Sequence, residues 1–234
     1  MPLARALART AHGLRNHALD LLFTPRCVQC QREGSYVCNR CLAKVRGLSG
    51  GYQPAGTITT ASGACITERI AIDGVHAPFA MEGVVREAIH QLKYQGLRAI
   101  APTLAEMMTN HLRGTGVRAD ALVPVPLHAR RLRQRGYNQA ELLASHIARE
   151  TGLPLRTDLL ERREYLGPQA RSGSQAERWA HVRNAFSGRP AASGLRILLI
   201  DDVCTTGATL NACALALRDS WAASIAGLTC AREV

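Results

Sequence analysis

The stretch Ile-Leu-Leu-Ile-Asp-Asp-Val-Cys-Thr-Thr-Gly-Ala-Thr, residues 197–209, predicts the fold class of this chain. Its four branched aliphatic residues are typical of a parallel strand that is buried on both faces. Two acidic residues end the predicted strand, and a turn rich in hydroxyl groups and glycine leads into an apolar pattern of helical spacing. A strand, a turn and a helix N-terminus in this order predict an α/β fold with a phosphate site at the turn.

The side chains of this stretch indicate what the ligand carries besides phosphate. Asp201 and Asp202 have the wrong charge to hold a phosphate, so we expect them to accept hydrogen bonds from sugar hydroxyls or to help hold Mg²⁺. The predicted ligand is a phosphorylated, hydroxyl-rich sugar. The alternative is an ordinary strand, turn and capped helix with solvated acids. We interpret Cys204 as a space-filling residue rather than a catalytic thiol. The predicted phosphate-binding residues are Thr205, Thr206, Gly207, Ala208 and Thr209.

The order of aliphatic residues, Asp-Asp, two further residues, Thr-Thr-Gly and a closing Thr resembles the 5-phosphoribosyl-1-diphosphate (PRPP) motif of type I phosphoribosyltransferases. The resemblance implies that Asp201 and Asp202 contact the ribose hydroxyls and that residues 205–209 wrap the 5-phosphate. It also implies Mg²⁺ bound with PRPP, and displacement of pyrophosphate from C1 of the ribose by a nitrogen nucleophile. The sequence does not identify that acceptor.

A second candidate segment follows the predicted strand at residues 121–125, where Leu-His-Ala-Arg-Arg-Leu-Arg-Gln-Arg-Gly-Tyr-Asn-Gln occupies residues 127–139. Arginine suits bidentate contact with phosphate, and several arginines together can neutralise a pyrophosphate. We expect Arg130, Arg131 and Arg135 to contact the ligand from a loop at the same sheet edge. The loop leads into a helix capped near Asn138. A solvated surface turn is the alternative.

Four cysteines near the N-terminus form two knuckles, Cys27-Val-Gln-Cys30 and Cys38-Asn-Arg-Cys41. Two CxxC knuckles predict a zinc site, and four thiolates leave no open position for a catalytic water, so we expect a structural role. Disulfides are the competing interpretation, and a redox CxxC is a weaker one because the surrounding sequence lacks the βαβ pattern of that site. The other cysteines, expected to be buried or semi-buried, are Cys65, Cys204, Cys213 and Cys230.

Residues 1–22 show apolar positions at helical spacing with arginines between them, which predicts an amphipathic helix. We expect it to dock on its own domain; a transit peptide and an interfacial anchor are the alternatives. No stretch has signal-peptide or membrane-spanning length, so we expect a cytoplasmic protein without a membrane span. The formal net charge is +11 and is concentrated in residues 1–50 and 118–189, which favours phosphate-bearing ligands, single-stranded nucleic acid among them.

The predicted organisation has three parts: the amphipathic helix and zinc knuckles at 1–46, a Gly/Ser/Thr-rich linker at 47–68, and the main domain at 69–234. Alternating strands and helices in the main domain predict a mostly parallel sheet flanked by helices, with the ligand beyond the carboxyl ends of the strands. The expected elements are strands near 70–75, 121–125, 197–202 and 224–231, helices over 81–94, 102–112 and 138–151 and from 210 onward, and an extended piece near 153–160.

Four blocks together narrow the resemblance: LLFTPRCVQC at 21–30, IHQLKYQG at 89–96, VPVPLHxRRLRxRGYNQ at 123–139, and DDVCTTGAT at 201–209. In this order they are similar to the ComF family of competence-associated, phosphoribosyltransferase-like proteins. That resemblance implies an N-terminal zinc module on a type I phosphoribosyltransferase fold, a link to the uptake of single-stranded DNA, and a helicase partner. It also implies that Lys93, Tyr94, Pro124 and Val125 lie at the cleft. For Lys93 and Tyr94, a helix-end lysine and a core-edge tyrosine are the alternatives.

Two differences from the family pattern accompany the resemblance. Many members have a second pair of knuckles where this chain has Cys65 alone, and residues 166–186, which correspond to a mobile flap of type I enzymes, have Leu166 in place of a threonine and His181 in place of an asparagine. Two functions therefore stay open. One is Mg²⁺-dependent transfer of a phosphoribosyl group; the other is a non-catalytic, PRPP-binding adaptor that binds a helicase or single-stranded DNA.

Overall fold

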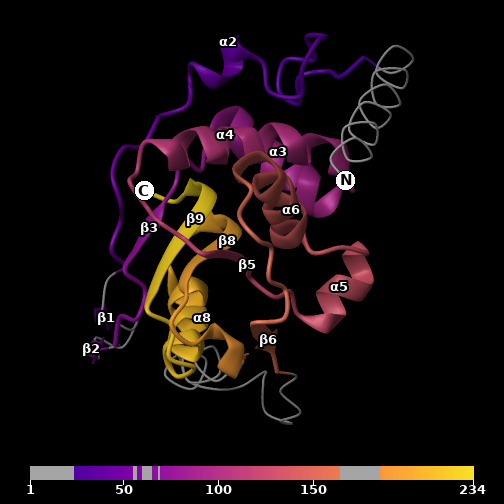
Figure 1. The fold of residues 1–234 in the computed structure, drawn as a ribbon. Helices are drawn as coiled ribbons and strands as arrows, with labels where there is room; N and C mark the ends of the chain where they lie inside the picture. Colours follow the sequence, from indigo (N-terminus) through magenta and orange to yellow (C-terminus); the bar gives the residue numbers. More distant parts are fainter. Residues whose placement is uncertain (1–23, 55–56, 60–64, 68, 164–184) are drawn as a thin grey trace.

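A computed structural model describes residues 24–54, 57–59, 65–67, 69–163 and 185–234 (Figure 1). Its central sheet has the strand order β3-β9-β8-β5, with β4 also beside β9, and every pair in this sheet is parallel. The fold class predicted from the sequence, a mostly parallel sheet flanked by helices, is thereby confirmed. The strands are β3 (Gly74–His76), β4 (Phe79–Ala80), β5 (Ala121–Pro124), β8 (Arg196–Cys204) and β9 (Ser224–Arg232).

Helices cover both faces of the sheet, and β8 shows why (Figure 1). Leu198 and Ile200 pack into one hydrophobic cluster with α3, α4 and α6, whereas Ile197 and Leu199 pack into a second cluster with α8. Each of these side chains is at most 2% exposed, and burying one stabilises the fold by about 1.5–3 kcal/mol. The helices are α3 (Gly83–Tyr94), α4 (Ala101–Arg113), α6 (Gln139–Thr151) and α8 (Ala208–Arg218).

The helix expected over 138–151 is present, with the local signals that the sequence indicates. The Asn138 side chain accepts a hydrogen bond from the Ala140 backbone N–H at 3.1 Å, and Gly152 ends the helix in the left-handed region at φ 76°. The strand expected near 70–75 instead begins at Gly74. Residues 70–73 are held at both ends: the Asn211 side chain of α8 accepts a hydrogen bond from the Ala71 backbone N–H at 2.8 Å, and the Asp73 backbone N–H donates to the Ile225 carbonyl of β9 at 2.8 Å.

Smaller elements complete the described chain. Beside α8 lies a small sheet in which β6 (Leu160–Arg162) and β7 (Phe186–Gly188) pair antiparallel. A Cβ on Gly188 would collide with the Ala216 backbone, so this sheet rests directly on the helix. The extended piece expected at 153–160 is reduced to a bridge between Leu122 and Leu155 that precedes β6. The remaining elements are α2 (Asn39–Leu42), β1 (Thr57–Thr59), β2 (Cys65–Thr67), η1 (Arg98–Ile100), α5 (Ala129–Arg135) and η2 (Pro190–Ala192).

Some expectations concern residues that the structure does not describe. The amphipathic helix at 1–22, Leu166, His181 and most of the expected flap lie outside the described residues. In the part of the chain that is described, none of the helices has both the length and the apolar character needed to cross a membrane.

Candidate functional site

The turn between β8 and α8 presents the predicted phosphate-binding groups to solvent. Thr205, Thr206 and Thr209 are exposed, while Gly207 is buried and adopts the left-handed region at φ 81°, a conformation that glycine reaches without steric cost. The backbone N–H groups that open α8 have no partners within the helix and carry the positive end of its dipole. Hydroxyls, N–H groups and helix dipole therefore converge on one exposed turn that suits a phosphate.

The acidic pair lies inside β8 and not after it, which corrects the expectation that the strand ends at Asp202. Val203 and Cys204 continue the pairing with β9, opposite Ala231 and Arg232. Because successive side chains of a strand point to opposite faces, Asp201 shares the α8 face with Leu199, and Asp202 shares the α3 face with Ile200. The two side chains therefore leave the strand on opposite faces.

Each carboxylate has its own electrostatic surroundings. Asp202 is nearly buried, and its Oδ2 atom lies 2.6 Å from the Lys93 ammonium of α3. Burial, and then the nearby charge of Asp202, raise the pKa of Asp201 well above its usual range. Asp201 also accepts a hydrogen bond from the Asp202 backbone N–H at 2.9 Å. Asp202 is thus paired with a lysine, while the environment of Asp201 favours its neutral form.

A groove of about 430 Å³ brings together residues that lie far apart in the sequence. Lys93 and Tyr94 contribute from the end of α3, and Arg131 and Arg135 contribute from α5. The Arg135 guanidinium stands over the Tyr94 ring at 5.6 Å from its centre. Tyr94 is 69% exposed, so the core-edge alternative does not describe it. Four of the predicted site residues therefore line one groove, and Lys93 joins this groove to Asp202.

The arginine segment is a helix, α5, where a loop was expected. The Arg130 backbone N–H donates to His128 Nδ1 at 3.1 Å, which caps the helix start, and Gly136 ends it in the left-handed region at φ 77°. Helical spacing places Arg131 and Arg135 on one side, toward the groove. Arg130 is exposed and is not among the residues that line the groove, so the structure separates it from the two arginines with which it was grouped.

Contacts behind α5 fix its position relative to α3 and β5. The Tyr137 hydroxyl donates a hydrogen bond to the Leu92 carbonyl, and the Asn138 side-chain amide donates to the Val125 carbonyl at 3.0 Å. Pro124 and Val125, which were expected to contact the ligand, are both buried. Their side chains therefore pack beneath the cleft and are not exposed on its surface.

Arg162 on β6 is a candidate that the sequence did not indicate. Its guanidinium stands over the Phe186 ring at 5.1 Å from the ring centre, and among the described residues it has no ion pair and no hydrogen bond. Burial first, and then the charge of Arg131, lower its pKa, while Cys213 and Asp201 act to raise it. Arg162 is therefore a partly buried cation whose pKa responds to the charges of Asp201 and Arg131. In the sequence it lies in an Arg-rich stretch without a motif, so no local signal distinguishes it.

The four N-terminal cysteines meet as the knuckle spacing predicts. The sulfur atoms of Cys27, Cys30, Cys38 and Cys41 all lie within 4.8 Å of one another, and those of Cys30 and Cys38 are 3.6 Å apart. A tetrahedral zinc with bonds of about 2.3 Å separates its sulfurs by about 3.8 Å, so the donor set fits zinc. Burial acts to raise the pKa of Cys27, but hydrogen bonds from the backbone of Cys30, Cys38 and Gln29 outweigh it and lower the pKa to about 6.

No family model matches the chain. Among curated proteins it is 33% identical over 138 residues to competence protein F of Haemophilus influenzae, covering 56% of this chain and 60% of that protein. It is 31% identical over 142 residues to the DNA utilization protein YhgH of Salmonella typhimurium, covering 58% and 62%. Competence protein ComFC of Bacillus subtilis is 26% identical over 209 residues, covering 84% of each. The chain thus spans about three fifths of the first two relatives.

Solved structures with a likeness to this chain include a glutamine PRPP amidotransferase from B. subtilis, complexed with ADP and GMP. The two are 19% identical, with a TM-score of 0.43, and the match covers 73% of this chain and 34% of that one. The fold assignment rests on the parallel sheet, the helices on its two faces and the four-cysteine cluster. Over more than half of its length the chain is thus similar, at about 30% identity, to proteins named competence protein F and DNA utilization protein YhgH, and at 26% identity over most of its length to competence protein ComFC.

Proposed function

We propose that this protein binds PRPP together with Mg²⁺ at the turn of residues 205–209 and in the adjoining groove. The observation that carries the proposal is the ion pair between Lys93 and Asp202, because it joins the exposed phosphate turn to the groove that holds Arg131 and Arg135. The turn suits the 5-phosphate, and the arginine-lined groove suits the pyrophosphate. The acids between them suit the ribose hydroxyls.

The same arrangement supports transfer of the phosphoribosyl group to a nitrogen nucleophile. The bond that forms joins the acceptor to C1 of the ribose, and the bond that breaks releases pyrophosphate from C1. Arg131 and Arg135 stabilise the charge that develops on the leaving group, and the turn and the acids hold the ribose for in-line attack. Bound Mg²⁺ supplies further charge neutralisation on the pyrophosphate, and carboxylate oxygens such as those of Asp201 and Asp202 are of the donor type that Mg²⁺ takes.

We further infer a link to DNA uptake in the cytoplasm. Its support is the set of relatives named competence protein F, competence protein ComFC and DNA utilization protein. The net charge of +11 favours polyanionic partners.

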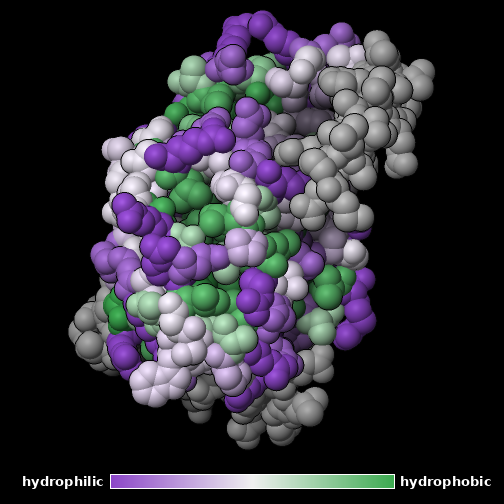
Figure 2. Space-filling view, in the orientation of Figure 1, coloured by the Kyte–Doolittle hydropathy of each residue, from purple (hydrophilic) through white to green (hydrophobic). Residues whose placement is uncertain are grey.

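The second candidate is a non-catalytic adaptor that binds PRPP and also binds single-stranded DNA or a helicase. The observations that favour it are the exposure of Arg130, Leu132 and Arg133 on the outer side of α5 and the exposed ring of Tyr94 beside Arg135 on the groove side. In Figure 2 the region of α5 shows strongly hydrophilic residues beside a hydrophobic area. Arginines that follow a phosphate backbone and a ring that stacks on a base are the two parts of a single-strand binding surface.

Incubation of the purified protein with Mg²⁺, PRPP and candidate nitrogen acceptors tests the enzyme. We expect isothermal titration to show Mg²⁺-dependent PRPP binding, and a pyrophosphate assay to show release that disappears in Asp201→Asn/Asp202→Asn. Asp219→Asn, an exposed acid at the end of α8, is the matched control and should behave as wild type. Tight PRPP binding without pyrophosphate release above background would refute the enzyme and favour the non-catalytic adaptor. Absence of PRPP binding would refute both candidates.

The adaptor's DNA surface has a separate test. Arg130→Ala/Arg133→Ala should weaken binding of a poly-pyrimidine single strand and lower the slope of log K against log salt by about 0.7 for each phosphate that the variant no longer neutralises. Arg113→Ala, an exposed arginine on α4, controls for the removal of surface charge. An unchanged slope in the double variant counts against α5 as a DNA surface.

A further inference from the structure

Residues 47–54, here called the strap, run from the cysteine module along the edge of the central sheet. Gly47 forms a bridge with Phe79, and Tyr52 forms an antiparallel bridge with Val75 in which each backbone N–H donates to the other residue's carbonyl at 2.8 Å. Composition alone indicated a linker here. In the structure, the strap is paired to the sheet up to the point where it reaches the phosphate turn.

The strap reaches that turn with Pro54. A Cβ placed on Gly207 would lie 2.8 Å from Pro54 Cγ and 2.9 Å from Pro54 Cβ, whereas carbon atoms in contact are about 3.5–4.0 Å apart. The pyrrolidine ring therefore occupies the space that any side chain at Gly207 would need. Pro54 is buried, and Gly207 is the residue whose left-handed backbone turns the chain from β8 into α8. The ring forms one wall of the phosphate turn.

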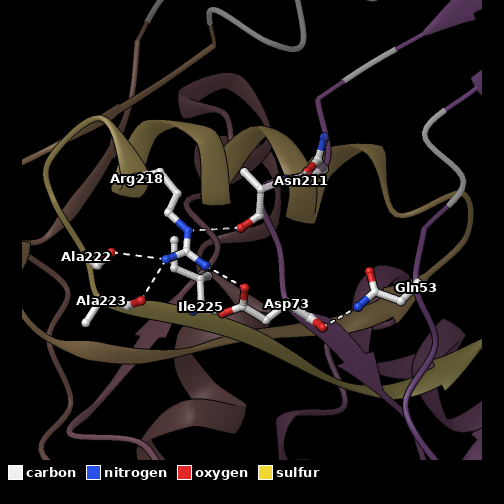
Figure 3. Close-up of polar contacts among 8 residues, drawn as sticks. Gln53, Asp73, Asn211, Arg218, Ala222, Ala223 and Ile225 are labelled. Carbon is white, nitrogen blue, oxygen red and sulfur yellow. Dashed lines mark hydrogen bonds and ion pairs between the residues drawn. The ribbon is translucent and has the colours of Figure 1, made fainter.

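Neighbouring contacts hold the strap and α8 to a common support (Figure 3). The Gln53 amide donates to the Asp73 carbonyl at 2.5 Å, just before Pro54. The Asp73 carboxylate lies 2.5 Å from the Arg218 guanidinium and accepts from the Ile225 backbone N–H at 2.7 Å. Asp73 thus connects the strap to both α8 and β9.

The beginning of α8 is held from the same side. The side-chain oxygen of Asn211 accepts a hydrogen bond from the Ala71 backbone N–H at 2.8 Å, and its side-chain NH₂ donates to the Arg69 carbonyl at 3.1 Å. Its own backbone N–H donates to the Gly207 carbonyl at 2.9 Å, so Asn211 belongs to the first turn that follows the loop. The strap and residues 69–73 therefore fix Gly207 and the first turn of α8 together.

We propose that Pro54 is a positioning residue for the phosphate turn, and that the strap keeps this turn in its ligand-binding shape before the ligand arrives. A proline ring has a fixed φ and no rotamers to lose, so it can form a wall at low entropic cost. The turn itself is rich in small residues and exposed, so without that wall its backbone would have to be ordered by the ligand. The inference rests on the proposed binding of a sugar phosphate at residues 205–209.

The test is titration of PRPP with Mg²⁺ into the full chain and its variants, with a thermal melt of each. Pro54→Gly should bind PRPP about tenfold more weakly, which corresponds to the free-energy cost of ordering about one residue on binding, and should still unfold cooperatively, at a lower temperature because the unfolded chain gains freedom. Gln53→Ala, which frees the strap without altering the wall, should weaken binding in the same direction. Pro190→Gly, an exposed proline at the start of η2, is the matched control and should bind as wild type.

A rescue experiment separates positioning from general support. Gly207→Ala should bind poorly because its Cβ meets the Pro54 ring, and Pro54→Gly/Gly207→Ala should recover part of that affinity because the ring is gone. A merely structural role predicts additive losses. Wild-type affinity in Pro54→Gly, or additive losses in the double variant, overturns the inference. Absence of PRPP binding by the wild type instead overturns the proposed function on which it rests.

Discussion

The Lys93 ammonium lies 2.6 Å from Asp202 Oδ2, with the lysine side chain 21% exposed and the aspartate side chain 3% exposed. This contact joins the last turn of α3 to the strand that carries the phosphate motif. An opposite charge at this distance offsets part of the cost of burying a carboxylate inside a parallel sheet. It also places the lysine beside both Asp202 and the arginine-lined groove.

Removal of this ion pair should destabilise the fold. Lys93→Met keeps the volume of the side chain but leaves the Asp202 carboxylate buried without its counter-charge, which should lower the free energy of unfolding by about 3 kcal/mol. Lys44→Met is the matched control, because Lys44 is exposed and is the chain's other lysine. Urea unfolding at neutral pH measures both. The double variant Lys93→Met/Asp202→Asn should regain part of the stability that Lys93→Met loses. Equal stability of Lys93→Met and Lys44→Met would contradict a stabilising role of the ion pair.

Arg162 should contribute to ligand affinity although no motif contains it. Arg162→Gln should weaken Mg²⁺-dependent PRPP binding about tenfold or more, because a hydrogen bond to a charged group contributes about 1.5–3 kcal/mol. Arg163→Gln is the control: its exposed side chain donates to the Ser187 hydroxyl at 2.9 Å. Calorimetric titration of PRPP with Mg²⁺ into the two variants measures both affinities. Equal affinities would show that Arg162 does not contact the ligand.

Zinc should be stoichiometric and structural. We expect about one zinc per chain in the wild type and loss of most of it in Cys27→Ser, with a lower melting temperature, because four thiolates close the coordination shell. Cys213→Ala, which removes a buried thiol of α8, should keep the metal. Metal analysis of the purified proteins is the measurement. A metal-free wild type, or full zinc content in Cys27→Ser, contradicts the assignment.

The pair between Asp120 and Arg196 should make stability depend on pH at the acidic end. Hydrogen bonds from the Arg196 side chain and backbone lower the pKa of Asp120 to about 2, below its usual value near 3.8. Because the folded pKa is depressed, the contribution is complete above about pH 5 and disappears as the pH falls through 4 toward 2. The difference in urea midpoint between wild type and Asp120→Asn should therefore shrink over that range. A difference that persists at about pH 2 would be inconsistent with this linkage.

Much of the fold follows from local sequence patterns. Four consecutive aliphatic residues indicated a buried strand at 197–200, and Asn138 with Gly152 marked the two ends of a helix. The strand expected near 70–75 begins only at Gly74, because the Ala71 backbone N–H bonds to the Asn211 side chain of α8 and not to a strand. The sequence around Arg131 was expected to form a loop because it is rich in arginine and follows a predicted strand. In the structure these residues form α5.

The sequence by itself determined the chemical groups of this protein: the hydroxyl turn after a buried strand, the acid pair, the arginines and the four cysteines. Each of these is a short-range pattern, and short-range patterns record backbone preference and ligand type. Only the tertiary structure decided that Asp201 and Asp202 face opposite sides of β8, that Arg131 faces the groove while Arg130 does not, and that Pro54 contacts Gly207. These relationships depend on strand register, helix rotation and contacts between segments distant along the chain, which local sequence patterns do not encode.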